Sequence, residues 1–198
     1  KLVKTLNIGK EASFISIKND DAGNIYALDK ISNSVYKFAN DNLVKDFKIT
    51  QKEAITGLYV KDYIYVATGS GHIISFDLSN GNVRSNLQLK DIPKSVTSFH
   101  HFAISDRFII LVNRFNHKAY SFSLKDGSFI KEIGGAGGPK TYSPQSNMQV
   151  DISYEPLKFL FPEEIFYKNG LVYVADSGNG RIQAIPEDYF TFREVIIE

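Results

Sequence analysis

Four segments of this chain share one pattern, in which a run of small and β-branched residues ends at a short polar residue before a turn. The clearest copy reads Gly-Leu-Val-Tyr-Val-Ala-Asp-Ser-Gly-Asn-Gly-Arg-Ile-Gln-Ala-Ile over residues 170–185. Weaker copies end at Asp29, Thr68 and Asn113. The pattern predicts a strand, a turn and a second strand. A single hairpin of this kind cannot bury its own apolar faces, so its repetition constrains the fold of the whole chain.

The spacing of the four residues that end these strands gives the size of the repeat. These marker residues are Asp29, Thr68, Asn113 and Asp176, and they are separated by 39, 45 and 63 residues. A period of roughly 40–45 residues is typical of one four-stranded blade of a β-propeller. Short apolar runs separated by turn signals fill the intervals, and no amphipathic helix of three turns is evident. We therefore predict an all-β fold, a β-propeller with four recognisable four-stranded blades.

The same spacing divides the chain into blades. The blades are expected over residues 9–50, 51–91, 92–134 and 160–198, with an insertion over residues 134–161 in the long last interval. Residues 1–8 contain a leftover segment, Leu2–Ile8, which is typical of the outer strand of a preceding or closing blade. Two arrangements fit. In the favoured one the chain is part of a six-bladed ring whose earlier blades are absent, and in the other the four blades close alone.

The fourth copy carries a family signature. Residues 161–183 read Phe-Pro-Glu-Glu-Ile-Phe-Tyr-Lys-Asn-Gly-Leu-Val-Tyr-Val-Ala-Asp-Ser-Gly-Asn-Gly-Arg-Ile-Gln, and this stretch resembles an NHL-repeat β-propeller. The first copy keeps the Gly and Asp of that pattern, whereas the second and third have Thr68 and Asn113 in place of the Asp. The resemblance implies a propeller, usually six-bladed, that most often serves as a binding platform. It does not imply one activity, because a fold hosts many functions.

The amino-acid composition restricts the classes of partner and the cellular compartment that we expect for this protein. The formal net charge is +1, so no bulk electrostatic attraction to nucleic acid or to a membrane surface is expected. No apolar run approaches the roughly 20 residues of a membrane-spanning helix. The chain has no cysteine, which excludes disulfides and thiolate metal sites and fits a bacterial extracytoplasmic protein, periplasmic or at the cell surface. Because the chain starts at Lys1, we expect it to be trimmed or excerpted, and further blades could come from missing sequence or from another chain.

One rim of the predicted propeller is the candidate binding surface. The turns after the marker residues and the connections between blades share this rim, and the long insertion Gly134–Phe161 belongs to it. Its basic and aromatic residues are the candidate binding residues. They are Lys30, His72, Arg114, His117, Tyr142, Tyr154, Phe159 and Arg181. The leading prediction is a non-enzymatic scaffold that binds another protein, a peptide or a glycan through this rim.

The alternative is a hydrolase or lyase with a metal-assisted site at the channel mouth. The resemblance implies this possibility, because an amidating lyase of the NHL type uses metal-bound histidines and lactonase-like relatives gather acidic residues and asparagines around calcium. In this chain Glu163, Glu164, Asp176, Asn113 and Asn179 lie on the same predicted rim. Paired carboxylates can bind calcium or perform acid–base chemistry. Glu163 and Glu164 are neighbours in sequence, however, and are expected to diverge.

Two further patterns resemble ligand-binding motifs without meeting their requirements. His72 and His117 each lie four residues after a marker, so we expect them at equivalent places on neighbouring blades. Zinc would need both imidazole nitrogens within about 2.1 Å, which equivalent points on adjacent blades do not normally allow. Gly134–Thr141 approaches a phosphate-binding loop, but Pro139 removes a main-chain donor. No catalytic residue, metal ligand or cofactor is therefore predicted, and calcium or zinc belongs only to the enzyme alternative.

Overall fold

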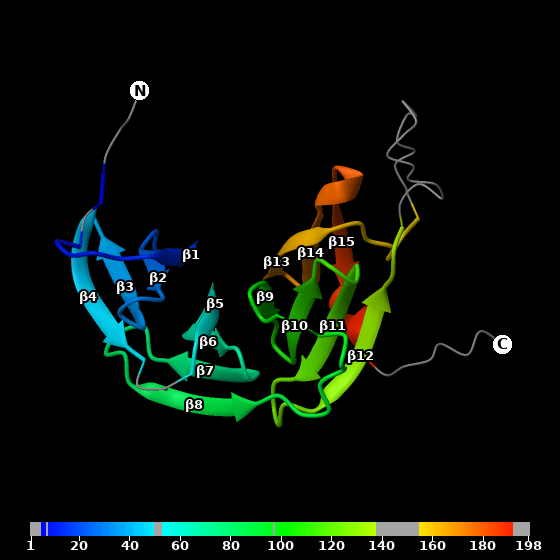
Figure 1. Cartoon of the computed structure of the whole chain (residues 1–198), viewed down its shortest axis with the longest axis horizontal. Coiled ribbons are helices and arrows are strands. Elements are labelled where there is room, and N and C mark those ends of the chain that lie inside the picture. The colour runs from blue at the N-terminus through cyan, green and yellow to red at the C-terminus, as the bar shows by residue number, and fades with distance from the viewer. Residues whose placement is uncertain (1–4, 7, 50–52, 97, 138–154, 192–198) are drawn as a thin grey trace. The chain divides into compact units, whose positions relative to one another are not determined.

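The computed structural model describes residues 5–6, 8–49, 53–96, 98–137 and 155–191. The chain divides into two compact units, and Figure 1 labels the strands of each. Unit 1 comprises residues 1–88 with 98–100, and unit 2 comprises residues 89–97 with 101–198. The described residues form fifteen strands and two short 3₁₀ helices, and none of them lies in an α-helix. The predicted all-β class is therefore confirmed.

Unit 1 contains the first two blades, each an antiparallel sheet whose strands follow in chain order. The first blade consists of β1 (Phe14–Asn19), β2 (Ile25–Asp29), β3 (Ser34–Ala39) and β4 (Asn42–Lys48). The second consists of β5 (Ile55–Val60), β6 (Ile64–Thr68), β7 (His72–Phe76) and β8 (Val83–Gln88). Each marker residue ends the second strand of its blade, as the repeat predicted.

Unit 2 contains the third and fourth blades. The third blade consists of β9 (Phe102–Ile104), β10 (Phe108–Asn113), β11 (Lys118–Ser123) and β12 (Phe129–Gly134). The fourth shows three strands, which are β13 (Pro162–Lys168), β14 (Leu171–Asp176) and β15 (Arg181–Pro186). The 3₁₀ helix η1 (Ser177–Asn179) joins β14 to β15, and η2 (Glu187–Phe190) follows β15.

Two expected outer strands lie largely outside the described residues. The predicted last strand, Thr191–Ile197, lies outside the described residues except for Thr191, which is not in a strand. The predicted leading strand, Leu2–Ile8, is described only at Thr5, Leu6 and Ile8, and these three residues are not in a strand either.

Two hairpins are closed by the tight turns that their sequence requires. Asn40 and Asp41 join β3 to β4 with φ angles of 48° and 65°, and Asn169 and Gly170 join β13 to β14 with φ angles of 51° and 76°. Two consecutive residues with positive φ give a type I′ turn, whose twist matches that of the flanking strands. Asn, Asp and Gly tolerate this conformation better than other residues, so the local sequence sets the register of both hairpins.

The cores lie on the central strands of the blades. Every residue of β6 and of β10 is buried, as expected for strands that are covered on both faces. In unit 1 one cluster joins the two blades, and it contains Tyr26, Leu28, Val35, Phe47, Ile49, Ile55, Leu58, Val60, Ile64, Val66, Ile74 and Phe76. In the fourth blade, by contrast, β14 alternates between buried and half-buried residues. One side of that sheet is therefore less well covered.

Candidate functional site

The two aspartate markers are structural anchors. Asp29 and Asp176 are both fully buried. The Asp29 carboxylate accepts hydrogen bonds from the main-chain N–H of Ser13 at 2.7 Å and from Ser32 Oγ at 2.6 Å. The Asp176 carboxylate accepts one from the N–H of Leu160 at 2.6 Å. Each aspartate thus ties the turn after its strand to the residue that leads into the first strand of the same blade.

Hydrogen bonding also sets the charge state of Asp29. Burial alone would raise the pKa of this carboxyl, but the hydrogen bonds from Ser32, Ser13 and Ile31 outweigh it and lower the pKa. The carboxylate is therefore held ionised by its own turn. A side chain occupied in this way is not available as an acid or base for a substrate.

The markers of the other two blades close their turns with neutral groups. The Asn113 side chain donates to Ser95 O at 3.1 Å and accepts from the N–H of Phe115 at 3.0 Å. Thr68 Oγ1 accepts from the N–H of His72 at 3.1 Å. Asn and Thr therefore replace Asp without loss of the turn, which explains why the sequence repeat is degenerate at these positions.

These anchored turns expose a pair of residues at the same place in two blades. The second residue after the marker is Ile31 in the first blade and Phe115 in the third, with 57% and 79% of their surface exposed. In each case the marker accepts the N–H of that residue, at 3.1 Å for Ile31 and 3.0 Å for Phe115. The residue before it is an exposed cation, Lys30 or Arg114. We call these pairs, Lys30-Ile31 and Arg114-Phe115, the tips.

The sequence pattern indicated the cations of the tips as binding residues but not Ile31 and Phe115. The sequence signal for these two residues is their position in the repeat, two residues after a marker. The second residue after the marker lies in the turn between two strands, where Ile31 and Phe115 are both exposed. The exposure of both residues follows from this position.

The tip of the third blade belongs to a wider patch within unit 2. The Arg114 guanidinium lies 5.7 Å from the centre of the Phe161 ring and forms an ion pair with Glu163. The His117 ring packs edge-on against Phe161 at 4.9 Å, and its Nδ1 accepts the N–H of Phe161 at 3.0 Å. That bond places the proton of a neutral His117 on Nε2. We call Arg114, Phe115, His117, Phe161 and Glu163 the tip patch.

The predicted equivalence of His72 and His117 is wrong. Three residues separate Thr68 from β7, whereas four separate Asn113 from β11. Counting four residues from the marker therefore reaches the first residue of a strand in the second blade but the last residue of the turn in the third. His72 donates through Nδ1–H to Asn86 Oδ1 at 2.8 Å, whereas His117 has a φ of 60°. A difference of one turn residue puts the two rings in different environments.

Arg181 and Phe159 are also placed otherwise than predicted. The Arg181 side chain is 17% exposed, and its Nε lies 2.8 Å from the Asp176 carboxylate. Its Nη2 donates to the main-chain oxygens of Glu155 and Lys158, both at 2.8 Å. Phe159 is fully buried. Both residues therefore hold the connection in place, which leaves neither of them free to contact a partner.

The ends of the insertion meet in a short main-chain clamp. Gly137 N donates to Phe159 O at 3.0 Å, and Phe159 N donates to Gly135 O at 3.2 Å, in a parallel bridge. A Cβ on Gly134 would lie 2.7 Å from His117 O and from the Phe159 ring, and Gly134 has a φ of 109°. A glycine is therefore needed at position 134, because its main chain approaches His117 and Phe159 too closely to leave room for a side chain. Tyr142 and Tyr154 lie outside the described residues.

The residues named for an enzyme are all engaged in contacts of their own. Glu163 pairs with Arg114, and Glu164 lies 3.7 Å from His101 Nδ1. Asn179 is buried and donates to Asp176 and to Gly137 O. Within the described ranges, no group of three or more His, Asp or Glu side chains is arranged to hold a metal ion. No helix in that part of the chain is long and apolar enough to cross a membrane.

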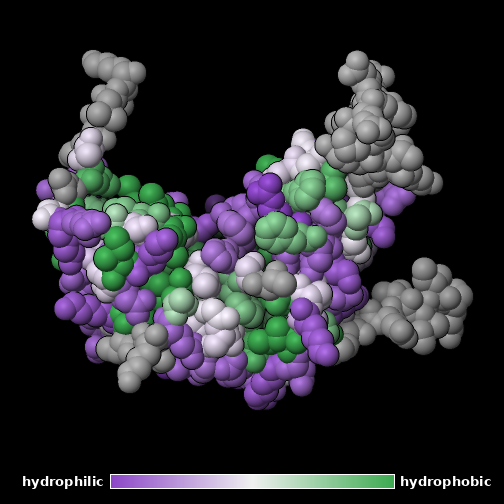
Figure 2. Space-filling model, in the orientation of Figure 1, coloured by the Kyte–Doolittle hydropathy of each residue, from purple (hydrophilic) through white to green (hydrophobic). Residues whose placement is uncertain are grey.

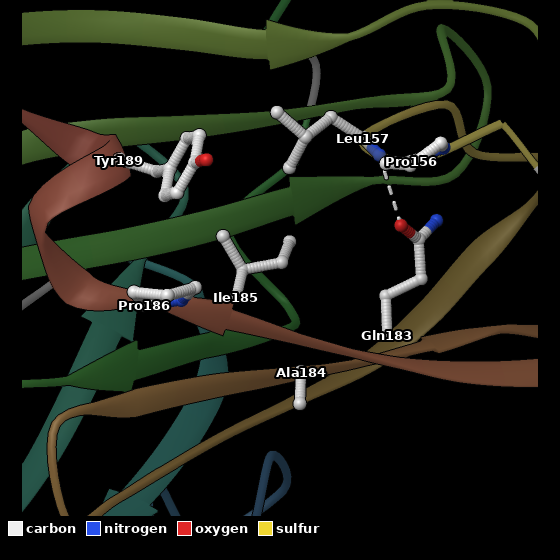
Figure 3. A pocket seen from close by; sticks show the side chains of 7 residues that line it. All are labelled: Pro156, Leu157, Gln183, Ala184, Ile185, Pro186 and Tyr189. Atoms are coloured by element: carbon white, nitrogen blue, oxygen red, sulfur yellow. Dashed lines mark hydrogen bonds between the residues drawn. The ribbon is translucent and has the colours of Figure 1, made fainter.

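A small apolar pocket of about 180 Å³ lies beside β15. Figure 3 shows Leu157 and Tyr189 on opposite sides of Ile185, with the N–H of Leu157 donating to Gln183 Oε1 at 3.0 Å. The pocket is lined by Pro156, Leu157, Gln183, Ala184, Ile185, Pro186 and Tyr189. Its polar groups are few, so it suits an apolar side chain better than a charged ligand.

Comparison with known proteins identifies the fold. No protein-family model and no curated protein sequence matches the chain. Among solved structures it is similar to a glutaminyl cyclase from Myxococcus xanthus (TM-score 0.57, 9% identity), with 89% of this chain and 73% of that chain aligned. It is also similar to a virginiamycin B lyase from Staphylococcus aureus (TM-score 0.54, 12% identity, 93% and 59% aligned). A third match is the β-propeller domain of Cps50 (Swd1) from Myceliophteria thermophila (TM-score 0.53, 16% identity, 87% and 53% aligned).

These likenesses show the fold alone, because every identity is low. The chain has a β-propeller fold, as the sequence predicted. It spans 73%, 59% and 53% of the lengths of the three chains just named.

Proposed function

We propose that this protein is a β-propeller scaffold that binds another protein through the tips, and that it does so without catalysis. The observation that carries the proposal is the repeated exposure of a cation and a large apolar residue at one position of the repeat, Lys30-Ile31 in the first blade and Arg114-Phe115 in the third. Isolated exposed apolar residues are normal on a protein surface. Two of them at equivalent positions, each fixed by a buried marker, indicate a shared role.

The chemistry of the tips suits a protein partner. Aromatic residues and arginine are enriched at the centres of protein interfaces, where they dominate the binding free energy. The tips are also held rigid by the hydrogen bonds of Asp29 and Asn113. A rigid loop loses little conformational entropy on binding, which favours affinity. In the tip patch the charge of Arg114 is balanced by Glu163, so the exposed Phe115 ring is the main contact offered.

We further propose that the propeller is of the NHL type. The support is the fourth blade, where the sequence from Phe161 to Gln183 follows the family pattern and the Asp176 anchor performs the turn-closing task that the repeat requires. Propellers of this type mostly serve as binding platforms, which agrees with the use of the tips.

Site-specific crosslinking tests the function. A photoreactive phenylalanine in place of Phe115 is expected to give a discrete crosslinked protein in extracts of the source organism. The same group in place of Val83, an exposed residue on the outer strand β8, is the matched control and is expected to give none. Phe115→Ala combined with Ile31→Ala should abolish recovery of that protein. Equal crosslinking at both positions, or none at Phe115, would contradict the proposal.

A metal assay separates the proposal from the enzyme alternative. Stoichiometric calcium or zinc in the purified protein, together with turnover that is lost on chelation, would favour the hydrolase or lyase. Crosslinking that is unaffected by chelation would favour the scaffold.

A further inference from the structure

Three asparagines of the chain are followed directly by glycine. They are Asn80, Asn169 and Asn179. In such a pair the main-chain nitrogen of the glycine can attack the side-chain amide carbon of the asparagine, because glycine has no Cβ to hinder the approach. The attack requires that the peptide between the two residues can rotate and that its N–H is not held in a hydrogen bond. The structure distinguishes the three pairs on both requirements.

The Asn80-Gly81 pair, in the loop between β7 and β8, is held on both sides of its peptide. Gly81 N donates to Asp77 O at 2.9 Å, and Asn80 O accepts from Lys45 Nζ at 2.5 Å. The side-chain oxygen of Asn80 accepts from Asn82 N at 2.8 Å. Rotation of this peptide would therefore break hydrogen bonds of its own N–H and of its own carbonyl.

The Asn179-Gly180 pair, at the end of η1, is restrained by burial. Asn179 is 2% exposed. Its Nδ2 donates to the Asp176 carboxylate at 2.9 Å and to Gly137 O at 2.8 Å. Gly180 N donates to Ser177 O at 3.1 Å. The side-chain amide that would have to react is thus fixed in the Asp176 anchor and shielded from water.

The Asn169-Gly170 pair closes the hairpin of β13 and β14 and has neither restraint. Lys168 pairs with Leu171, so the ladder ends before the peptide between Asn169 and Gly170. Within the residues that the structure describes, neither the Asn169 side chain nor Gly170 N takes part in a hydrogen bond. Gly170 O accepts from Glu187 N at 2.9 Å, but this oxygen belongs to the next peptide. The peptide between Asn169 and Gly170 can therefore rotate without breaking a contact.

The same turn is open to solvent. Hydrophilic residues cover much of the visible surface of unit 2 (Figure 2). Lys168, Asn169 and Gly170 are three consecutive exposed residues. A Cβ added to Gly170 would meet no atom within 4 Å, so no neighbouring group obstructs movement at this position. Water can therefore reach any intermediate that forms there.

We propose that Asn169 is a site of spontaneous covalent modification, at which the asparagine becomes isoaspartate through a cyclic succinimide. The Gly170 nitrogen loses its proton and forms a bond to Cγ of Asn169, while the Cγ–Nδ2 bond breaks and ammonia leaves. Water then opens the ring. Where it cleaves the bond between the Gly170 nitrogen and the main-chain carbonyl carbon, the chain continues through Cγ and the product is isoaspartate. Cleavage at Cγ gives aspartate.

Isoaspartate would disturb the hairpin that Asn169 closes. It adds one carbon atom to the main chain between Lys168 and Leu171, whereas a type I′ turn keeps these residues paired with two ordinary residues between them. A displaced turn would also weaken the bond from Glu187 N to Gly170 O. The turn lies at the opposite end of β14 from Asp176. The proposal is thus separate from the tip patch and does not depend on the proposed function.

Ageing of the full chain followed by peptide mapping tests the proposal. After incubation at mildly alkaline pH, the peptide that contains Asn169 should gain the mass expected for replacing NH2 by OH. Electron-transfer fragmentation should identify isoaspartate in it. The folded protein should react at Asn169 about tenfold faster than at Asn80 or Asn179, because those pairs must first break hydrogen bonds. In urea the three rates should become similar, since each asparagine then simply precedes a glycine.

Asn169→Gly is the matched variant, because glycine adopts the positive φ of this turn and has no amide to lose. Aged wild-type protein should contain a second population that unfolds at a lower urea concentration, and the aged variant should not. Equal rates at the three pairs in the folded chain would overturn the proposal. A folded chain that reacts faster at Asn80 or Asn179, or that forms aspartate at position 169 without isoaspartate, would overturn it as well.

Discussion

The Asp176 anchor offers the sharpest test of how the blades are held together. Its carboxylate is fully buried and accepts four donors. These are Leu160 N at 2.6 Å, Arg181 Nε at 2.8 Å, Asn179 Nδ2 at 2.9 Å and Gln183 Nε2 at 3.0 Å. Asp176→Ala removes all four acceptor contacts at once and leaves the donors inside the protein.

The expected loss can be estimated from these contacts. Removing one partner of a buried ion pair typically costs about 3–5 kcal/mol. Arg181 keeps its two bonds to Glu155 O and Lys158 O, so part of its charge remains compensated. We therefore expect Asp176→Ala to lower the free energy of unfolding by about 3 kcal/mol. Asp176→Asn keeps an acceptor for Leu160 N but loses the charge, and we expect about 1–3 kcal/mol.

Urea unfolding followed by circular dichroism measures both losses. At about 2–4 °C per kcal/mol for a chain of this size, Asp176→Ala should also lower the melting temperature by about 10 °C. The control is Asp188→Ala, which removes an exposed partner of Arg107 and should cost less than about 1 kcal/mol. A change below about 1 kcal/mol for Asp176→Ala would refute the view that this side chain anchors the blade.

Three further outcomes are expected. Gly57→Ala should destabilise the protein by about 1–3 kcal/mol because its Cβ would lie 2.6 Å from two main-chain oxygens, whereas Gly69→Ala, with nothing nearer than 3.7 Å, should change little in the same urea assay. The pKa of Asp29 is lower in the folded state than the usual value of about 3.9. Its contribution to stability is therefore complete above about pH 4 and is lost as the pH falls through the folded-state pKa, and Asp29→Asn should flatten the acid limb of a stability–pH curve. Asn169→Thr should cost about 1–2 kcal/mol because a β-branched residue is strained at a φ of 51°, and an unchanged urea midpoint would contradict this.

The sequence predicted the strands well where a local signal existed. The marker residues end β2, β6, β10 and β14, because a buried hydrogen-bonding side chain is needed to close each turn. The type of side chain can vary, as Thr68 and Asn113 show. The repeat can therefore be recognised in the sequence even where the marker residue is no longer Asp.

Residue counting failed where the turns differ in length. His72 and His117 were matched by their distance from the marker, but one residue fewer in the second turn shifts His72 into β7. Phe159 and Arg181 could not be recognised as internal, because their burial depends on contacts between distant parts of the sequence, namely Phe159 with Gly137 and Arg181 with Glu155 and Lys158. The apolar tips at Ile31 and Phe115 were missed for the opposite reason, since hydrophobic residues are usually expected inside.

The main-chain clamp at the neck of the insertion has a consequence for protein engineering. Because the hydrogen bonds between Gly135, Gly137 and Phe159 join the two chain segments, these described residues set the distance between the end of β12 and the segment that leads to β13. A peptide grafted after Gly137 would therefore start and finish at a preset separation, and the entropy of closing it would grow only slowly with its length. We expect grafted recognition sequences of different lengths to be presented from one unchanged framework.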